Sequence, residues 1–202
     1  GLAFGAAILT RPHTALVPAS NGIWQSWKDR SIRPALLIGL GSAAGLGLLI
    51  LFNDAVFGSP SIIGGYSDSF ANRAASLDVL DYLGNVSLAL VHPIRGLLVY
   101  SPFLILLFIG LPAAWRVAPA WVKGSAVGGL LYLLLQLKAN RYSGGAGFWA
   151  YRYPLETLAA AAPLLLLSYT EWVTQQVQLV RKLFRWLLLA SILLTAIGAI
   201  FF

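Results

Sequence analysis

Apolar residues gather into six long runs along the chain, and short polar stretches separate them. The runs cover residues 2–19, 34–52, 96–115, 124–137, 155–169 and 183–202. A helix needs about 20 apolar residues to cross the hydrocarbon core of a bilayer, and unpaired backbone cannot face lipid. Arg11, Pro12 and His13 interrupt the first run, and because proline breaks the helical hydrogen-bond ladder, we expect that helix to start or kink there. The pattern therefore predicts an all-α, polytopic membrane bundle of about six transmembrane helices.

One connection between the runs, residues 53–95, is far longer than a turn requires. Glycine and proline punctuate its first part as turns, and a mostly apolar stretch follows at residues 77–91. That stretch is typical of an amphipathic or re-entrant helix at the membrane interface, with Ser76 as its N-cap and Asp78 in its first turn. Because the chain shows no internal repeat and no soluble segment, residues 1–202 are predicted to form a single membrane domain.

The composition supports the bilayer as the environment of this chain. Hydrophobic residues make up 58% of it and charged residues 10%, whereas soluble domains carry about 25% charged residues. The absence of cysteine excludes disulfides and thiolate zinc sites. The chain also lacks methionine and begins with Gly1 inside an apolar run, so we expect a fragment whose N-terminal part is missing. Glycines within residues 34–52 and 124–137 favour close contact between helices.

The basic residues behind the net charge of +7 are concentrated in particular loops, and this predicts the membrane topology. The loops near 20–34, 116–123 and 170–185 hold Lys28, Arg30, Arg33, Arg116, Lys123, Arg181, Lys182 and Arg185. The positive-inside rule places these loops in the cytoplasm, so that loops 53–95 and 138–154 face the periplasm, lumen or exterior. Because the basic residues lie at the ends of apolar segments, topology explains them, and we do not expect nucleic-acid binding.

The segment 141–154, RYSGGAGFWAYRYP, carries more chemistry than a membrane hairpin needs. It combines Arg141 and Arg152 with glycines and aromatic rings, and its positive charge runs against the positive-inside bias. A guanidinium group binds phosphate oxygens in two-pronged fashion, so we expect a surface for an anion carried by something apolar. Arg95 lies on the same side of the membrane. The alternatives are interfacial anchoring beside the aromatic belt, or pairing with an acidic side chain.

For several other polar residues the sequence is consistent with more than one role. Arg11 could face a cavity or snorkel to an interface. His13 and His92 are interpreted as hydrogen-bonded structural groups, since two distant histidines make a weak zinc site. Asp54 and Asp68 could hold a divalent cation or act as a base, although aspartate in a loop rich in glycine, serine and proline more often forms turns.

The order of the motifs carries a resemblance. An Arg-Pro within an apolar helix comes first, then NDAVFGSPSIIGGY after a span, RGLLVYSP entering another, and YSGGAGFWAYRYPLETLAAAAPLLLL. Over about residues 3 to 170 this order resembles the C-terminal half of bacterial, especially actinobacterial, polytopic glycosyltransferases of the GT-C superfamily. These are relatives of the protein mannosyltransferases and of the aminoarabinose lipid A transferases.

The resemblance implies a cell-membrane enzyme that takes a sugar from a polyprenyl-phosphate donor. It transfers that sugar to a glycan, lipid or protein acceptor outside the cytoplasm. Arginines at the outer mouth of the spans hold the donor phosphate in that superfamily, a role that Arg152, Arg141 and Arg95 match. Aromatic residues would line the sugar or lipid path, and those that match are Tyr66, Trp149 and Tyr151.

One departure from that superfamily matters for catalysis. Its acidic base lies in the first outer loop, near the N-terminus, and neither Asp54 nor Asp68 is in the matching place. We therefore assign no base and expect this piece alone to be inactive. The rival interpretations are a transporter or flippase, which predicts charged or broken helices near the midplane, and a polymerase or ligase of lipid-linked glycans.

Overall fold

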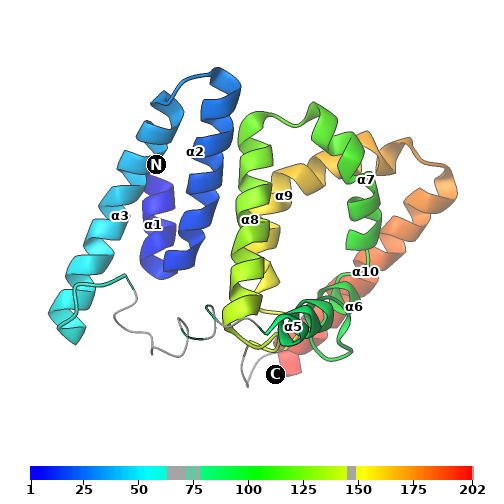
Figure 1. The fold of residues 1–202 in the computed structure, drawn as a ribbon. Coiled ribbons are helices and arrows are strands. Elements are labelled where there is room, and N and C mark those ends of the chain that lie inside the picture. Colours follow the sequence, from blue (N-terminus) through cyan, green and yellow to red (C-terminus); the bar gives the residue numbers. More distant parts are fainter. Residues whose placement is uncertain (63–71, 73–74, 76–77, 145–148, 202) are drawn as a thin grey trace.

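The computed structural model describes residues 1–62, 72, 75, 78–144 and 149–201, and the described part is helical with no strand. The prediction of an all-α fold is therefore confirmed. Figure 1 shows two groups of helices that meet at the long central helix α8, Ala120–Ala139. Tyr66, Asp68 and Ser76, three residues singled out in the sequence, lie outside the described residues.

The first apolar run folds as two helices instead of one span. α1, Leu2–Thr10, ends at Arg11, whose extended backbone (φ −149°, ψ 103°) breaks the helix, and the short 3₁₀ turn η1, Pro12–Ala15, follows. α2, Leu16–Asp29, then runs in the opposite direction to α1 (Figure 1). The predicted break at this proline is confirmed, and it reverses the chain where the sequence suggested a start or a kink.

Glycines let the N-terminal helices approach each other closely, as the sequence predicts. α3, Arg33–Phe57, packs against α1, and a Cβ atom added at Gly45 would collide with the backbone of Gly5. α8 meets α2 in the same way, because a Cβ atom at Gly128 would lie 2.6 Å from the Cα of Val17. A buried hydrogen bond of 2.6 Å, donated by Asn21 Nδ2 to Ser125 Oγ, also joins α2 to α8.

The C-terminal group packs against the other side of α8. Its elements are α5, Val79–Val91; α6, Leu97–Tyr100; α7, Leu104–Val117; α9, Pro154–Glu171; the 3₁₀ turn η2, Val173–Gln175; and α10, Gln178–Phe201. The predicted span 96–115 is broken between α6 and α7, at a segment that contains Pro102. Leu104 and Val173 form the centre of the apolar core of this group.

Some of the helices could cross a membrane, but the predicted number of six is not confirmed. Among the described residues, three helices are long and apolar enough to cross a bilayer: Arg33–Phe57, Ala120–Ala139 and Gln178–Ile200. α1, α2 and α7 have only 9, 14 and 14 residues. Large apolar side chains on α3 are exposed, with Leu40 71% exposed, as expected for a helix that faces lipid.

The predicted interfacial helix is present as α5. Its N-cap is Asp78 and not Ser76, because the Asp78 carboxylate accepts a 3.0 Å hydrogen bond from the backbone N–H of Asp81. Aspartate caps a helix better than serine when the negative charge also meets the positive end of the helix dipole. The helix ends at Val91, two residues before Pro93, as the sequence predicts.

The connections between the long helices lie at two ends of the bundle (Figure 1). The α2–α3 and α7–α8 connections, residues 30–32 and 118–119, lie together at one end, which we call the basic end (Figure 1). The α8–α9 connection, residues 140–153, lies with α5 at the opposite end, which we call the loop end (Figure 1). Two of the loops assigned to the cytoplasm and the loop 138–154 assigned to the outside thus lie at opposite ends of α8.

Candidate functional site

Two of the predicted phosphate-binding arginines meet at the same turn of the loop end. Arg95 Nη1 donates a 2.6 Å hydrogen bond to the carbonyl oxygen of Ser143. Arg152 Nη1 donates a 3.1 Å hydrogen bond to the carbonyl oxygen of Gly144. The turn closes with a 3.1 Å bond from the Gly144 N–H to the Arg141 carbonyl, and Gly144 has a left-handed φ of 68° that suits glycine. The structure therefore brings Arg95 and Arg152 together with the turn that begins at Arg141.

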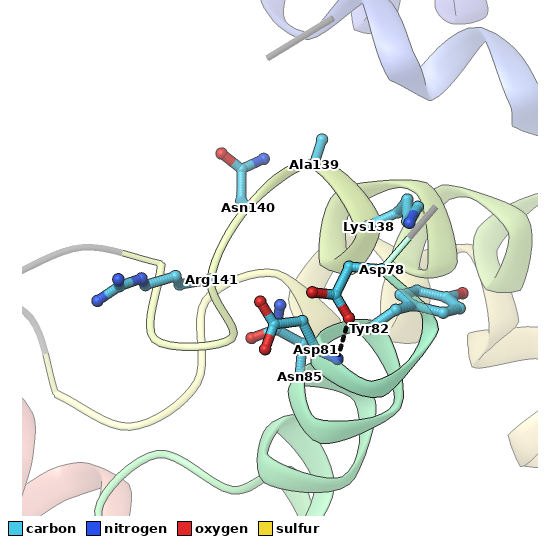
Figure 2. A pocket seen from close by; sticks show the side chains of 8 residues that line it. All are labelled: Asp78, Asp81, Tyr82, Asn85, Lys138, Ala139, Asn140 and Arg141. Carbon is cyan, nitrogen blue, oxygen red and sulfur yellow. Dashed lines mark hydrogen bonds between the residues drawn. The ribbon is translucent and has the colours of Figure 1, made fainter. Parts of the chain in front are cut away.

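A cavity of about 210 Å³ lies beside that turn, between α5 and the C-terminal end of α8. Figure 2 shows its lining residues: Asp78, Asp81, Tyr82, Asn85, Lys138, Ala139, Asn140 and Arg141. Asn85 connects the two sides, because its Nδ2 donates to the Leu137 carbonyl (3.3 Å) and its Oδ1 accepts from the Tyr142 N–H (3.2 Å). Lys138 Nζ lies 5.5 Å from the centroid of the Tyr82 ring.

The acidic and basic side chains that line this cavity do not point toward each other. Asp78 and Asp81 lie close together at the start of α5, whereas the Arg141 side chain extends away from them (Figure 2). Arg141 thus lines the cavity without turning its guanidinium toward the two carboxylates. Sequence reasoning treated Asp78 only as a helix-terminal residue and did not place Asp81 at a site. Their spacing of three residues at a helix start was the available signal.

The aromatic residues predicted to line a sugar or lipid path are held by neighbouring helices. The Tyr151 hydroxyl lies 2.8 Å from Ser101 Oγ, at the break between α6 and α7. Trp149 Nε1 donates to the Leu194 carbonyl of α10 (3.3 Å), and its ring meets Tyr100 edge-on at 5.7 Å. Ala150 between them has a left-handed φ of 59°. Both rings thus anchor the loop, and a path-lining role for them stays a prediction, as it does for Tyr66.

A second polar cluster lies next to the first turn of α9. Arg11 forms an ion pair with Glu156, and Arg11 Nη1 donates a 3.1 Å hydrogen bond to the Tyr132 hydroxyl. His13 Nδ1 lies 3.4 Å from Gln136 Nε2. This cluster ties the reversal between α1 and α2 to α8 and to α9. Sequence reasoning missed Glu156, although a lone acid in an apolar run is the natural partner of a lone arginine in another.

Glu156 and His13, both in this cluster, have different electrostatic surroundings. Glu156 lies in the first turn of α9, where a negative charge is favourable, yet its Oε2 is buried without a hydrogen-bond partner among the described residues. Burial lowers the pKa of His13 below its ordinary value of 6.5, and the nearby Arg11 charge lowers it further. His13 is therefore a neutral neighbour of the Arg11–Glu156 pair at pH 7.

The described residues contain no group of three or more His, Cys, Asp or Glu side chains placed to hold a metal ion. Asp54 is exposed in the last turn of α3. The divalent cation considered from the sequence is therefore not located by the part of the chain that the structure describes.

Comparisons with protein-family models, with curated proteins and with solved structures find no match to this chain.

Proposed function

We propose that this chain is part of a membrane glycosyltransferase that moves a sugar from a polyprenyl-phosphate donor to a glycan, lipid or protein acceptor outside the cytoplasm. The observation that supports this most is the meeting of Arg95 and Arg152 at the turn begun by Arg141. These arginines come from separate segments of the chain, and the turn that they both bind belongs to the α8–α9 connection at the loop end (Figure 1).

The chemistry of a lipid-phosphate leaving group favours this arrangement. When the sugar departs, negative charge grows on the bridging oxygen of the phosphate, and fixed cations stabilise that charge. Arg95 and Arg152 are tied to backbone carbonyls, so their positions are set before any ligand arrives. Tethered cations lose less conformational entropy on binding than freely rotating side chains do.

The adjacent cavity suits a polyhydroxylated group. Carboxylates at Asp78 and Asp81 and amides at Asn85 and Asn140 can accept or donate hydrogen bonds to sugar hydroxyls. The Tyr82 ring offers an apolar face to a sugar ring. We therefore place the sugar at this cavity and the phosphate at the neighbouring turn. No residue among those described is assigned as the catalytic base.

The membrane orientation follows from the charge distribution. The positive-inside rule puts the basic end in the cytoplasm, so the loop end would face outward in a multi-pass protein of the cell membrane. Donors of this class are consumed at an outward-facing site in the superfamily that the sequence resembles. The proposed multi-pass topology includes the three helices that are long and apolar enough to cross a bilayer.

A transporter or flippase is the second candidate, and the Arg11–Glu156 ion pair favours it. An ion pair between segments with apolar surroundings often marks a transport pathway. Here the pair lies where α1 ends and α9 begins, and not in the middle of a long helix. This terminal position fits a structural tie better than a midplane substrate site.

The test uses the protein at its native length in membranes, with radiolabelled polyprenyl-phosphate sugars. We compare the native protein with Arg152→Lys, Arg152→Ala and the control Arg116→Ala, which removes an exposed arginine from the last turn of α7. Arg152→Ala should lower sugar transfer by about 10- to 100-fold, because a charge-assisted hydrogen bond contributes about 1.5–3 kcal/mol. Arg152→Lys keeps the charge but loses the fork and should fall between.

Protein level, membrane insertion and limited proteolysis of the loop report whether it remains folded in each variant. Equal transfer by native protein and Arg152→Ala would reduce Arg152 to a loop anchor. Failure of the native protein to bind any lipid-linked sugar, with the loop folded, would favour the transporter instead.

A further inference from the structure

The N-terminal part of α10 carries three exposed positive side chains, Arg181, Lys182 and Arg185, which we call the α10 cation cluster. None of the three forms an ion pair with an acidic side chain among the described residues. The sequence itself offers no acid nearby, because residues 172–202 contain neither aspartate nor glutamate. The charge of the cluster is therefore uncompensated within the part of the chain that the structure describes.

Helical spacing brings these charges close to one another. Arg185 follows Arg181 by four residues and Lys182 by three, and residues at both spacings are neighbours on a helix surface. Like charges at such spacing destabilise a helix. The helix dipole does not offset this repulsion, because its negative pole lies at the far end of α10. An anion bound between the three side chains would remove the unfavourable interaction.

The packing of α10 keeps the cluster on the outer surface of the bundle. Phe184 is only 8% exposed, and its ring meets Phe103 edge-on at 5.9 Å between centroids. Val180 and Leu187 of the same helix pack against the core that contains Phe184. These apolar contacts set the rotation of α10 about its axis, and they leave the cationic side chains free to meet a partner from outside the bundle.

The surroundings of the cluster are those of a membrane interface. Leu179 and Trp186, on either side of it in the sequence, are 74% and 68% exposed. Tryptophan is enriched where the bilayer meets water, and Gln178–Ile200 is long and apolar enough to cross a bilayer. α10 runs from the cluster toward the loop end (Figure 1), so the cluster belongs to the opposite leaflet. An anion at this level is the phosphate of a lipid.

We propose that the α10 cation cluster binds an anionic phospholipid, one whose headgroup phosphate is not balanced by an amine. The guanidinium forks of Arg181 and Arg185 suit phosphate oxygens, and Lys182 adds a point charge. A zwitterionic headgroup would instead bring its own ammonium group beside three cations, with no acidic side chain in residues 172–202 to receive it. This site is separate from the proposed donor site and does not rest on the glycosyltransferase proposal.

The chain offers a matched control for removal of this charge. The cluster triple combines Arg181→Gln, Lys182→Gln and Arg185→Gln. The control triple combines Lys28→Gln, Arg30→Gln and Arg33→Gln, which removes three exposed cations around the α2–α3 connection. Asp29 lies among those residues in the sequence and remains in the control. The two variants therefore lose the same charge, and only the first loses the cluster that we assign to lipid.

The experiment titrates phosphatidylglycerol or phosphatidylcholine into the purified protein in neutral detergent and follows binding by native mass spectrometry. We expect the native protein to prefer phosphatidylglycerol. One cation near a lipid surface contributes about fivefold in affinity. The dissociation constant for phosphatidylglycerol should therefore rise about fivefold in each single variant and about a hundredfold in the cluster triple. The control triple should leave it unchanged.

Thermal unfolding gives a second measurement, in which the order of two variants should reverse. In neutral detergent alone, the cluster triple should unfold at the same temperature as the native protein or higher, because it lacks the like-charge repulsion. With phosphatidylglycerol present, the native protein should unfold at the higher temperature, since a ligand that binds the folded state stabilises it. A purely structural role for the three cations would give no such reversal.

Four results would overturn the proposal. Equal affinity of the native protein for the two lipids would show that the cluster does not select a charged headgroup. An equal loss of affinity in the control triple would show general attraction between a basic protein and an anionic lipid. Stabilisation by inorganic phosphate equal to that by phosphatidylglycerol would identify a free anion as the ligand. An unchanged dissociation constant in a folded cluster triple would place the lipid elsewhere.

Discussion

The ion pair between Arg11 and Glu156 should stabilise the fold by a measurable amount. The two side chains are 32% and 26% exposed, so the pair is neither fully buried nor on the open surface. Breaking a buried pair costs about 3–5 kcal/mol, and an exposed pair contributes about 0–1 kcal/mol. Solvent screening at this exposure places Glu156→Gln between these limits, and we expect the free energy of unfolding to fall by about 1–3 kcal/mol.

A double-mutant cycle measures the pair itself. The variants are Arg11→Gln, Glu156→Gln and their combination, unfolded reversibly in bicelles and followed by tryptophan fluorescence. The double variant should be less destabilised than the sum of the single variants, because the second substitution removes a charge that has already lost its partner. Tyr132→Phe, measured alongside, separates the contribution of the hydrogen bond that Arg11 donates to that hydroxyl.

Arg116→Gln is the control for removal of an exposed arginine, and it should change the free energy of unfolding by no more than about 0.5 kcal/mol. Additivity of Arg11→Gln and Glu156→Gln within about 0.3–0.5 kcal/mol would refute the reasoning. The tie between the α1–α2 reversal and α9 would then have to come from packing alone.

Three further outcomes are expected. Gly45→Ala should destabilise the protein by about 1–3 kcal/mol, because its Cβ atom would collide with the α1 backbone. Gly47→Ala should not destabilise the protein, because a Cβ atom there meets nothing within 4 Å. Equal thermal unfolding of the two variants would contradict the described α1–α3 contact. Asp78→Ala should lower the free energy of unfolding by about 1 kcal/mol and speed amide hydrogen exchange in the first turn of α5. Asp78→Asn is the control, because it keeps a capping oxygen. Unchanged exchange in Asp78→Ala would show that the cap contributes nothing. His13 should titrate below pH 6.5 in NMR spectra of the folded protein, because burial lowers its pKa. The stability that it contributes is therefore constant above pH 6.5 and declines as the pH falls through the folded-state pKa. A titration midpoint above pH 6.5 would refute its burial.

The sequence predicted the helical class and the positions of most helices because apolar runs and prolines act locally. The predicted run 124–137 became α8 and the run 155–169 became α9, each extended by a few residues. Helix ends were less accurate, since polar residues such as Gln178 can continue a helix beyond its apolar part. The break at Arg11 was visible in the sequence, but the direction of the chain after it depends on packing against α3 and α8.

The candidate site was predicted in part for a similar reason. Arginines predicted on the same side of the membrane can be expected to lie near one another, and Arg95 and Arg152, from two different loops, both bind the same turn. Their carbonyl partners and the cavity beside α5 depend on how a helix distant in sequence is placed. The contact of Glu156 with Arg11 depends on tertiary packing across many residues, which a linear pattern does not encode.

The same contact has a consequence for the order of events during biosynthesis. Glu156 follows Arg11 by 145 residues (156 − 11), so at about 5–20 residues per second the arginine leaves the ribosome about 7–30 s before its partner exists. An uncompensated guanidinium is costly within the hydrocarbon core. The first two helices should therefore remain near the surface of the membrane until α9 is made. Their final depth would then be set late, and loss of Glu156 should leave Arg11 accessible to water-soluble reagents in nascent chains of every length.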